Sequence, residues 1–411
     1  MESIGNLVFK DCQSRISGLE TFSNGKVAFL RLHTDDGLEG WGQFGGKDVD
    51  ITVELFHRRV APAVFGQKIS YPFELISSIV RFELNYKMMG VQLSKAIAGL
   101  DSAVWDTLGK YYNKSVCELL SGNCPKPFPC YASSISRKIK PKELAAKLVE
   151  LRNQHGIDAF KVKIGKRMGN GEDEWAGRTE AVISECRSKL GEGSLIGVDA
   201  NGAFDDVEQA KRVALLLEEK SIWFLEEPFP WMMYEKYEKL QEFLTGRNTS
   251  LFLAGGEQEF RIDIWEFIMK RLFPWKISQP DCGYCGGPTT ALLIDQLSAE
   301  NGIKFMPHSP QGDLMPVICW QLLCASPNAA SHMELACVDD GIAQIMLDSK
   351  TGIFQNDYFQ PAIQVERGMF KLLSSTSIVG WGIKMNENFI KNSTRISFSD
   401  TTADRNKRSF L

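Results

Sequence analysis

Phe160-Lys161-Val162-Lys163-Ile164 is a short apolar run that carries two lysines, and it opens the series of segments that decides the fold. Six more short apolar runs follow it, and each leads into an acidic or imidazole side chain. From Lys163 the successive steps are 36, 27, 31, 24, 27 and 26 residues, a spacing that suits one strand and one helix per step. The steps end at the following residues: Asp199, Glu226, Glu257, Asp281, His308 and Glu334.

Repeated strand-then-helix units predict an α/β fold with eight parallel strands, a (β/α)8 barrel of the TIM type. Helix-length mixtures of polar and apolar residues lie between most of the strands, for example Lys140 to His155 and Val207 to Lys220. Chemistry in such barrels sits at the carboxyl ends of the strands, where each ionisable residue of the series falls. The expected strands are Cys130–Ser133, Ala159–Ile164, Leu195–Asp199, Trp223–Glu226, Leu251–Ala254, Lys276–Ser278, Lys304–Met306 and Ser331–Glu334.

The sequence before the barrel predicts a smaller α+β domain. Lys26 to Thr34 alternates as a strand, Asp35-Asp36-Gly37 predicts a turn, and Leu38 to Gly42 returns as a second strand. Helical spacing of apolar residues follows over Ser94 to Lys110. The proline-rich segment 125–129 cannot continue a helix, so we expect an α+β domain over 1–128 and the barrel over 129–365. Residues 366–411 should return to the first domain through a strand at Ser377 to Lys384 and end in a mobile tail.

Composition excludes several classes of partner. The 47 basic and 51 acidic residues give a formal net charge of −4, which provides no basic field for nucleic acid or an anionic membrane. No apolar stretch has the length of a membrane span, so we expect a cytoplasmic protein. The ten cysteines should be reduced thiols there. Cys282 and Cys285 form a single CxxC without a second pair, which favours inert thiols over a metal or redox site.

The chemistry of the series points to a metal-assisted carbon acid. Asp199, Glu226 and Glu257 offer the hard oxygen ligands that Mg²⁺ prefers. Residues two apart on a strand share a face, so Lys161 joins Lys163, and Asn201 joins Asp199. Two neighbouring lysines near a cation disfavour each other's charge, which lets one act as a base.

A second proton-transfer group should come from consecutive strands, because the Asp281 carboxylate can fix the tautomer of His308 and raise its basicity. A metal between Lys163 and this dyad suits removal or delivery of a proton on either face of a carbon next to a carboxylate. The metal is needed because that proton is weakly acidic and the enediolate requires concentrated positive charge. Glu334, if protonated, could donate a hydrogen bond to the same oxyanion.

With these segments the chain resembles the enolase superfamily in its mandelate racemase branch, a superfamily already known for pairing a lysine or histidine base with Mg²⁺. The resemblance extends over Asp36 to Gly42, the helix Ala98 to Asp106 and the barrel, and it implies an α+β capping domain on the barrel. The resemblance also implies residue roles. Lys163 would be the base, and Lys161 would be the helper that contacts the substrate carboxylate. Asp199, Glu226 and Glu257 would be the Mg²⁺ ligands with Asn201 near metal or substrate, and His308 with Asp281 and Glu334 on strand eight match the other catalytic positions of the family.

Within that branch the loop Gln279 to Gly287 resembles that of sugar-acid dehydratases such as rhamnonate dehydratase, although that enzyme lacks the K-x-K pair. We therefore expect a Mg²⁺-dependent sugar-acid dehydratase in which Lys163 or His308 removes the α proton and water leaves, giving a 2-keto-3-deoxy acid. A 2-hydroxy-acid racemase or epimerase, a cycloisomerase of a lactone or anhydro sugar acid, and a non-catalytic barrel are the alternatives. Capping segments Gly18–Gly25 and Phe44–Asp48 should shape the substrate site, and the resemblance suggests a homo-oligomer.

Overall fold

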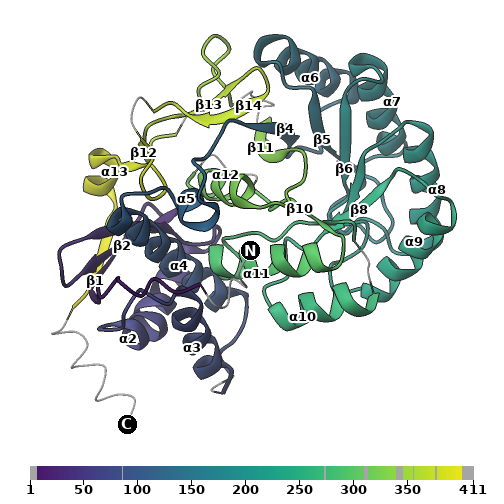
Figure 1. Cartoon of the computed structure of the whole chain (residues 1–411). Helices are drawn as coiled ribbons and strands as arrows, with labels where there is room; N and C mark the ends of the chain where they lie inside the picture. The colour runs from purple at the N-terminus through teal and green to yellow at the C-terminus, as the bar shows by residue number, and fades with distance from the viewer. Residues whose placement is uncertain are drawn as a thin grey trace.

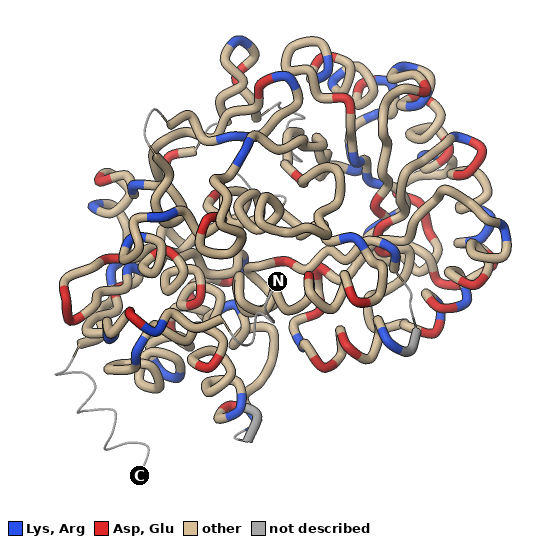
Figure 2. Tube along the Cα trace, in the orientation of Figure 1, with Lys and Arg blue, Asp and Glu red and all other residues tan. Residues whose placement is uncertain are grey.

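A computed structural model describes residues 7–85, 87–272, 275–309, 313–338, 346–354, 356–374 and 377–399. Figure 1 shows two parts, a small α+β cap built from both ends of the described chain and a large barrel between them. Basic and acidic residues are interspersed over both parts (Figure 2). No helix among the described residues is long and apolar enough to cross a membrane.

The cap is built on an antiparallel sheet with the strand order β16-β1-β2-β3. The predicted hairpin is confirmed, since β2 pairs with β3 so that Leu30 faces Gly42. Two strands of this sheet, β1 (Ile16–Ser23) and β16 (Thr394–Phe398), were not predicted from the sequence. The strands are β1 (Ile16–Ser23), β2 (Ala28–Thr34), β3 (Glu39–Gln43) and β16 (Thr394–Phe398), and the cap helices are α1 (Val49–Leu55), η2 (Phe56–Val60), α2 (Ala61–Val64), α3 (Pro72–Asn85), α4 (Val91–Tyr112) and α5 (Val116–Ser121).

Helix α4 is the central element of the cap and contains the predicted helix. Its residues Leu93 to Gly109 are all buried, because the helix packs against the cap sheet on one side and the barrel on another. Gly42 of β3 lies so close to the backbone of Gly99 that a Cβ there would overlap the Gly99 carbonyl oxygen. Asp106 joins distant parts of the chain, since it accepts hydrogen bonds from Trp41 N at 2.8 Å and Trp381 N at 2.9 Å.

The barrel has the eight predicted parallel strands, in the order β10-β9-β8-β7-β6-β5-β4, and it closes where β11 pairs with β4. Within the described residues, seven helices connect the strands on the outside, among them α6 and α8 near their predicted bounds (Figure 1). The strands are β4 (Phe128–Ser134), β5 (Ala159–Lys163), β6 (Leu195–Asp199), β7 (Phe224–Glu226), β8 (Phe252–Gly255), β9 (Ile277–Ser278), β10 (Lys304–Phe305) and β11 (Met333–Val338). The helices are α6 (Pro141–His155), α7 (Arg178–Leu190), α8 (Val207–Glu219), α9 (Tyr234–Gly246), α10 (Ile262–Phe267), α11 (Pro288–Glu300) and α12 (Met315–Ala325), with η3 (Ile268–Leu272) after α10.

The segment after β11 differs from the prediction. The strand expected at Ser377 to Lys384 is wrong, because Gly380 and Gly382 adopt positive φ angles of 60° and 76° that turn the chain. Only β15 (Lys384–Met385) is extended there, and it pairs with β12 (Phe359–Gln360). The strand that does return to the cap sheet is β16, which follows α13 (Glu387–Asn392). The predicted mobile tail falls mainly on residues 400–411, outside the described part.

A hairpin of β13 (Ile363–Glu366) and β14 (Met369–Leu372) extends the barrel sheet beyond β4.

Candidate active site

Strand register places the first members of the series side by side. Lys163, Asp199 and Glu226 are direct partners across β5, β6 and β7, and each is the last residue of its strand. All three side chains are buried or nearly so at the carboxyl end of the barrel. Lys163 Nζ donates a hydrogen bond to Asp199 Oδ2. The predicted grouping of these residues is therefore present in the structure.

Lys161 shares the inner face of β5 with Lys163, as strand alternation predicts. Its ammonium lies 2.8 Å from Glu226 Oε2 and 2.7 Å from Glu334 Oε1, so it connects β7 and β11 across the top of the barrel. Burial alone would lower the pKa of Lys161, but Glu226 and Glu334 outweigh that effect and raise it well above its ordinary value. The charged form of Lys161 is consequently favoured, and both of its carboxylate partners belong to the series.

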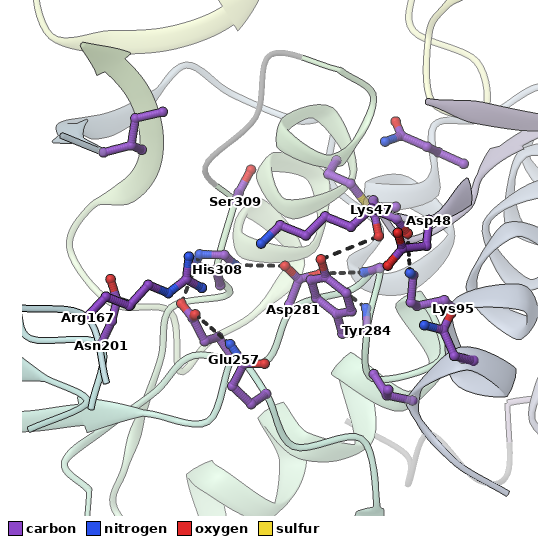
Figure 3. A pocket seen from close by; sticks show the side chains of 18 of the residues that line it. Lys47, Asp48, Lys95, Arg167, Asn201, Glu257, Asp281, Tyr284, His308 and Ser309 are labelled. Carbon is purple, nitrogen blue, oxygen red and sulfur yellow. Dashed lines mark hydrogen bonds and ion pairs between the residues drawn. The ribbon is translucent and has the colours of Figure 1, made fainter. Parts of the chain in front are cut away.

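His308 follows β10 and is held between two carboxylates, as Figure 3 shows. Its Nδ1 lies 2.7 Å from Asp281 Oδ2, and an isolated parallel bridge joins the backbones of these two residues. Its Nε2 lies 2.9 Å from Glu257 Oε2. Burial would lower the pKa of His308, but Glu257, Glu334 and Asp281 together raise it well above its ordinary value. The structure thus assembles the predicted dyad and makes its imidazole a cation.

Glu334 acts as a hydrogen-bond acceptor in the structure. It accepts a hydrogen bond from Ser309 N at 3.2 Å and pairs with Lys161. Burial favours the neutral acid, but Lys161 and then His308 hold the pKa of Glu334 below its ordinary value. Glu334 is therefore ionised, and in this arrangement it accepts hydrogen bonds instead of donating one.

The three predicted metal ligands carry more negative charge than their protein partners balance. Burial raises the pKa of Glu226 to about 8, and the Asp199 carboxylate adds to the effect despite the contact with Lys161. Against the effect of burial, His308 lowers the pKa of Glu257 to about 2, and Lys163 lowers that of Asp199. An excess of buried carboxylate oxygens is the donor chemistry that suits Mg²⁺.

Asp199, Glu226 and Glu257 therefore fit a divalent cation by chemistry and by position, at the ends of β6 and β7 and just after β8. As placed, however, no three His, Cys, Asp or Glu side chains in the described ranges converge closely enough to hold a metal. Lys163 occupies an oxygen of Asp199, and His308 lies against Glu257.

Two supporting residues were missed from the sequence. Arg137, three residues past β4, donates a hydrogen bond to Asn201 Oδ1 at 3.0 Å, while the Asn201 backbone N–H donates to Asp199 Oδ1 at 2.8 Å. Gln279 Nε2 donates to Glu226 Oε2 at 2.7 Å. Both follow the rule that located the other residues, a polar side chain at or just past the end of a strand, which was applied only to acids, lysines, Asn201 and His308.

The other acids and the cysteines next to the predicted site residues differ in their surroundings. Glu259 turns away from the site, since it accepts hydrogen bonds from Tyr234 Oη and Arg261 N. Glu227 is buried, and burial together with the Glu257 carboxylate raises its pKa well above its ordinary value. Cys282 and Cys285 are free and buried, which agrees with inert thiols.

A pocket of about 440 Å³ opens onto Lys163, Glu257 and His308. The cap contributes Gly46, Lys47 and Asp48 of the predicted segment Phe44–Asp48. Gln43 and residues of the first turns of α4 also line the pocket and were not predicted. The other predicted cap segment, Gly18–Gly25, is absent from the lining, because it forms β1 and its turn within the cap sheet. The cap residues in the wall are Gln43, Gly46, Lys47, Asp48, Val91, Gln92 and Lys95.

Comparisons with known proteins agree with this arrangement. Residues 143–389 match the family model described as enolase C-terminal domain-like, and residues 9–121 match the N-terminal domain of mandelate racemase / muconate lactonizing enzyme. A D-galactonate dehydratase of Pectobacterium atrosepticum is 28% identical over 73% of this chain and 76% of its own.

Two solved structures share the fold. A putative racemase from Roseobacter denitrificans is 30% identical, covers 94% of this chain and 100% of its own, and has a TM-score of 0.83. A mandelate racemase/muconate lactonizing protein from Paracoccus denitrificans, complexed with magnesium, is 21% identical and covers 93% of this chain and 98% of its own, with a TM-score of 0.79.

Proposed function

Because this chain belongs to the enolase superfamily, in the mandelate racemase and muconate lactonizing enzyme family, we propose that it is a Mg²⁺-dependent sugar-acid dehydratase. One observation carries the proposal: Lys163 and His308 lie at the two ends of a row of buried carboxylates, one against Asp199 and the other against Glu257. A substrate bound over this row meets a proton acceptor on one side and a proton donor on the other. The relative named D-galactonate dehydratase supports the same reaction class.

Proton transfer follows from the opposed positions of the two groups. Lys163 Nζ accepts the proton α to the substrate carboxylate, and the C–H electron pair passes into an enediolate. The β-hydroxyl then leaves and takes a proton from His308 Nε2, so that water departs. His308 suits this acid role because its pKa is raised well above its ordinary value by the surrounding carboxylates. The enol product takes up a proton to become a 2-keto-3-deoxy acid.

The other side chains bind and orient. We infer that Asp199, Glu226 and Glu257 hold the Mg²⁺ ion, which when bound supplies the positive charge that stabilises the enediolate. Lys161, kept charged by Glu226 and Glu334, contacts the substrate carboxylate. Asp281 fixes the His308 ring through Nδ1, which leaves Nε2 directed to the pocket.

A racemase or epimerase is the second candidate, and the same opposed placement of Lys163 and His308 favours it. If no β-hydroxyl is eliminated, His308 protonates the α carbon on the face opposite to Lys163 and the configuration inverts. The structural relative named a putative racemase supports this alternative. Substrate structure decides between the two outcomes, because elimination requires a hydroxyl on the β carbon. A cycloisomerase would need a lactone or anhydro sugar acid in the same site.

The test is a screen of hexonic and hexaric acids with Mg²⁺ that follows both 2-keto acid formation and exchange of the α proton with solvent deuterium. Keto-acid formation supports the dehydratase. Exchange with inversion and no keto acid supports the racemase, and neither signal with any acid of the set rejects both.

Two variants separate the proton-transfer roles. Lys163→Ala should abolish keto-acid formation and exchange together. His308→Asn should abolish keto-acid formation by at least a thousandfold while exchange continues, since Lys163 still removes the proton. Matched controls are Lys166→Ala, an exposed lysine on the loop after β5, and His332→Asn just before β11. Near-normal turnover in either active-site variant would show that the assigned role is wrong.

A further inference from the structure

One buried lysine in the pocket wall has no carboxylate within ion-pair distance. Lys95, in the first turns of α4, is 2% exposed and lines the pocket. Its ammonium donates a hydrogen bond to the carbonyl oxygen of Lys47 and lies 5.8 Å from the centre of the Tyr284 ring. No carboxylate oxygen of the described residues lies within 4.0 Å of it. A lysine ammonium has three donors, and the described contacts use one of them.

Buried lysines are normally paired, because an unpaired buried charge loses its hydration without compensation. Lys161 in the same protein shows the usual solution, with two glutamates at 2.7 and 2.8 Å. Lys95 shows the opposite condition. Burial lowers its pKa, the neighbouring Lys47 adds to this, and Asp48, Asp281 and Asp50 oppose it only through longer-range interactions. The ammonium therefore lacks a counter-charge within ion-pair distance, and it lines a pocket that can admit one.

Its position within the pocket indicates which part of a ligand it meets. Figure 3 shows Lys95 at the cap end, beyond Asp281 and Tyr284, whereas Glu257, His308 and Asn201 lie toward the opposite end. This cap wall is fixed against the barrel, since a Cβ on Gly45 would overlap the carbonyl oxygen of Gly283. The Tyr284 N–H is held by Asp281 Oδ1 at 3.2 Å. A ligand with its reacting carboxylate at the metal site would extend toward Lys95.

We propose that Lys95 is a specificity-determining residue that binds a second, terminal anionic group of the substrate, so that the preferred sugar acid carries negative charge at both ends. The inference rests on the proposed function and adds a substrate class, namely a dicarboxylic or phosphorylated sugar acid instead of a simple monoacid. A hydroxyl group would not satisfy the site, since it brings no charge to compensate the buried ammonium. A carboxylate or phosphate oxygen forms a charge-assisted hydrogen bond with it.

Equilibrium binding tests this without turnover. The full chain with Lys163→Ala and saturating Mg²⁺ is titrated calorimetrically with matched pairs, D-galactonate against galactarate and D-gluconate against D-glucarate, together with 6-phosphogluconate. A charge-assisted hydrogen bond in a desolvated site predicts that the dianionic member of at least one pair binds on the order of ten- to a hundredfold tighter. The phosphate arm shows whether the terminal anion is a phosphate or a carboxylate.

The added change Lys95→Met removes the charge and keeps the apolar stem. It should bring the ratio of dianion to monoanion affinity close to one while monoanion affinity stays within about threefold, as expected for one lost charge-assisted hydrogen bond. Lys114→Met, an exposed lysine just past the end of α4 and outside the pocket lining, is the matched control and should change the ratio little because solvent screens it.

Equal affinity for both members of every pair in the Lys95 protein would overturn the inference, and so would a preference that survives Lys95→Met. A variant that loses monoanion binding as well is replaced by Lys95→Gln, for which the same loss of preference is expected. If no sugar acid binds at all, the proposed function itself fails, and the subsite that rests on it fails with it.

Discussion

Asp101→Asn is predicted to stabilise the protein at alkaline pH and to leave it nearly unchanged at acidic pH. Asp101 lies in the middle of α4 and is fully buried. It accepts hydrogen bonds from Thr289 N at 2.6 Å and Thr289 Oγ1 at 2.7 Å, at the start of α11. Burial raises the pKa of Asp101 to about 7 from an ordinary value of 3.8, because these two hydrogen bonds only partly offset the lost hydration.

The sign and size of the effect follow from linkage. The folded protein holds the Asp101 proton to higher pH than the unfolded chain does. The stability that the neutral acid contributes is therefore complete below pH 4 and is lost as pH rises through 7. The difference from 3.8 to about 7 amounts to about 4 kcal/mol, of which about 2 to 3 kcal/mol falls between pH 5 and 8. The N-terminus of α11 favours a negative charge and reduces the expected change to about 2 kcal/mol.

The measurement is urea unfolding of both proteins at pH 5 and pH 8, with Asp50→Asn, an exposed acid on α1, as the control. Asparagine reproduces the donor and acceptor of the protonated carboxyl, so the variant should unfold at a similar urea concentration at pH 5. At pH 8 it should exceed the parent by about 2 kcal/mol in free energy of unfolding. If the two proteins differed in free energy of unfolding by the same amount at pH 5 and pH 8, the reasoning would be refuted.

Three further predictions concern the site and its frame. Asp281→Asn should lower turnover on the order of a thousandfold, because the His308 ring loses its ionised partner. The Mg²⁺ affinity measured by calorimetry should stay the same. Unchanged turnover would contradict the role of Asp281 in orienting His308. Glu226→Gln should weaken Mg²⁺ binding at least tenfold, and EDTA should abolish the activity of the parent until Mg²⁺ is restored; activity that persists in EDTA would exclude the metal role. Gly45→Ala should lower the free energy of unfolding by about 1 to 3 kcal/mol, because a Cβ there meets the Gly283 backbone. The measurement is the same urea titration. Gly25→Ala is the control: a Cβ there meets no neighbour but φ is +82°, so this variant reports backbone strain without the overlap.

The barrel was predictable because its strands combine two local signals, an apolar run and an ionisable residue at its end. Asp199 and Glu226 show why this works, since they end adjacent strands in direct register. Strand β1 escaped prediction because Glu20 in it is buried. Its charge is compensated by Arg31 and His33 from β2 and by Arg395 from the far end of the chain. Compensation between segments so distant in sequence leaves no local pattern.

The residues of the site also differ in whether a local sequence pattern marks them. Lys163, Asp199 and His308 follow strand ends and were predicted, whereas Lys95 lies on a helix whose buried faces depend on what packs around it. The ionised state of Glu334 was also out of reach of the sequence, because it depends on the distance of 2.7 Å to Lys161 across the barrel. Local periodicity locates such residues, but charge states follow from neighbours that only the fold brings together.

The pairing of β1 with β16 has a consequence for folding during synthesis. Leu19 pairs with Phe398, so the whole barrel sequence lies between two neighbouring strands of one sheet. The cap sheet cannot be completed until the ribosome has released the residues of β16, whereas the barrel strands are contiguous and can assemble earlier. Closing so long a loop is entropically costly and slow relative to local pairing. The cap walls of the pocket should therefore be the last part to become protected from hydrogen exchange, and catalytic competence should appear after the barrel has already formed.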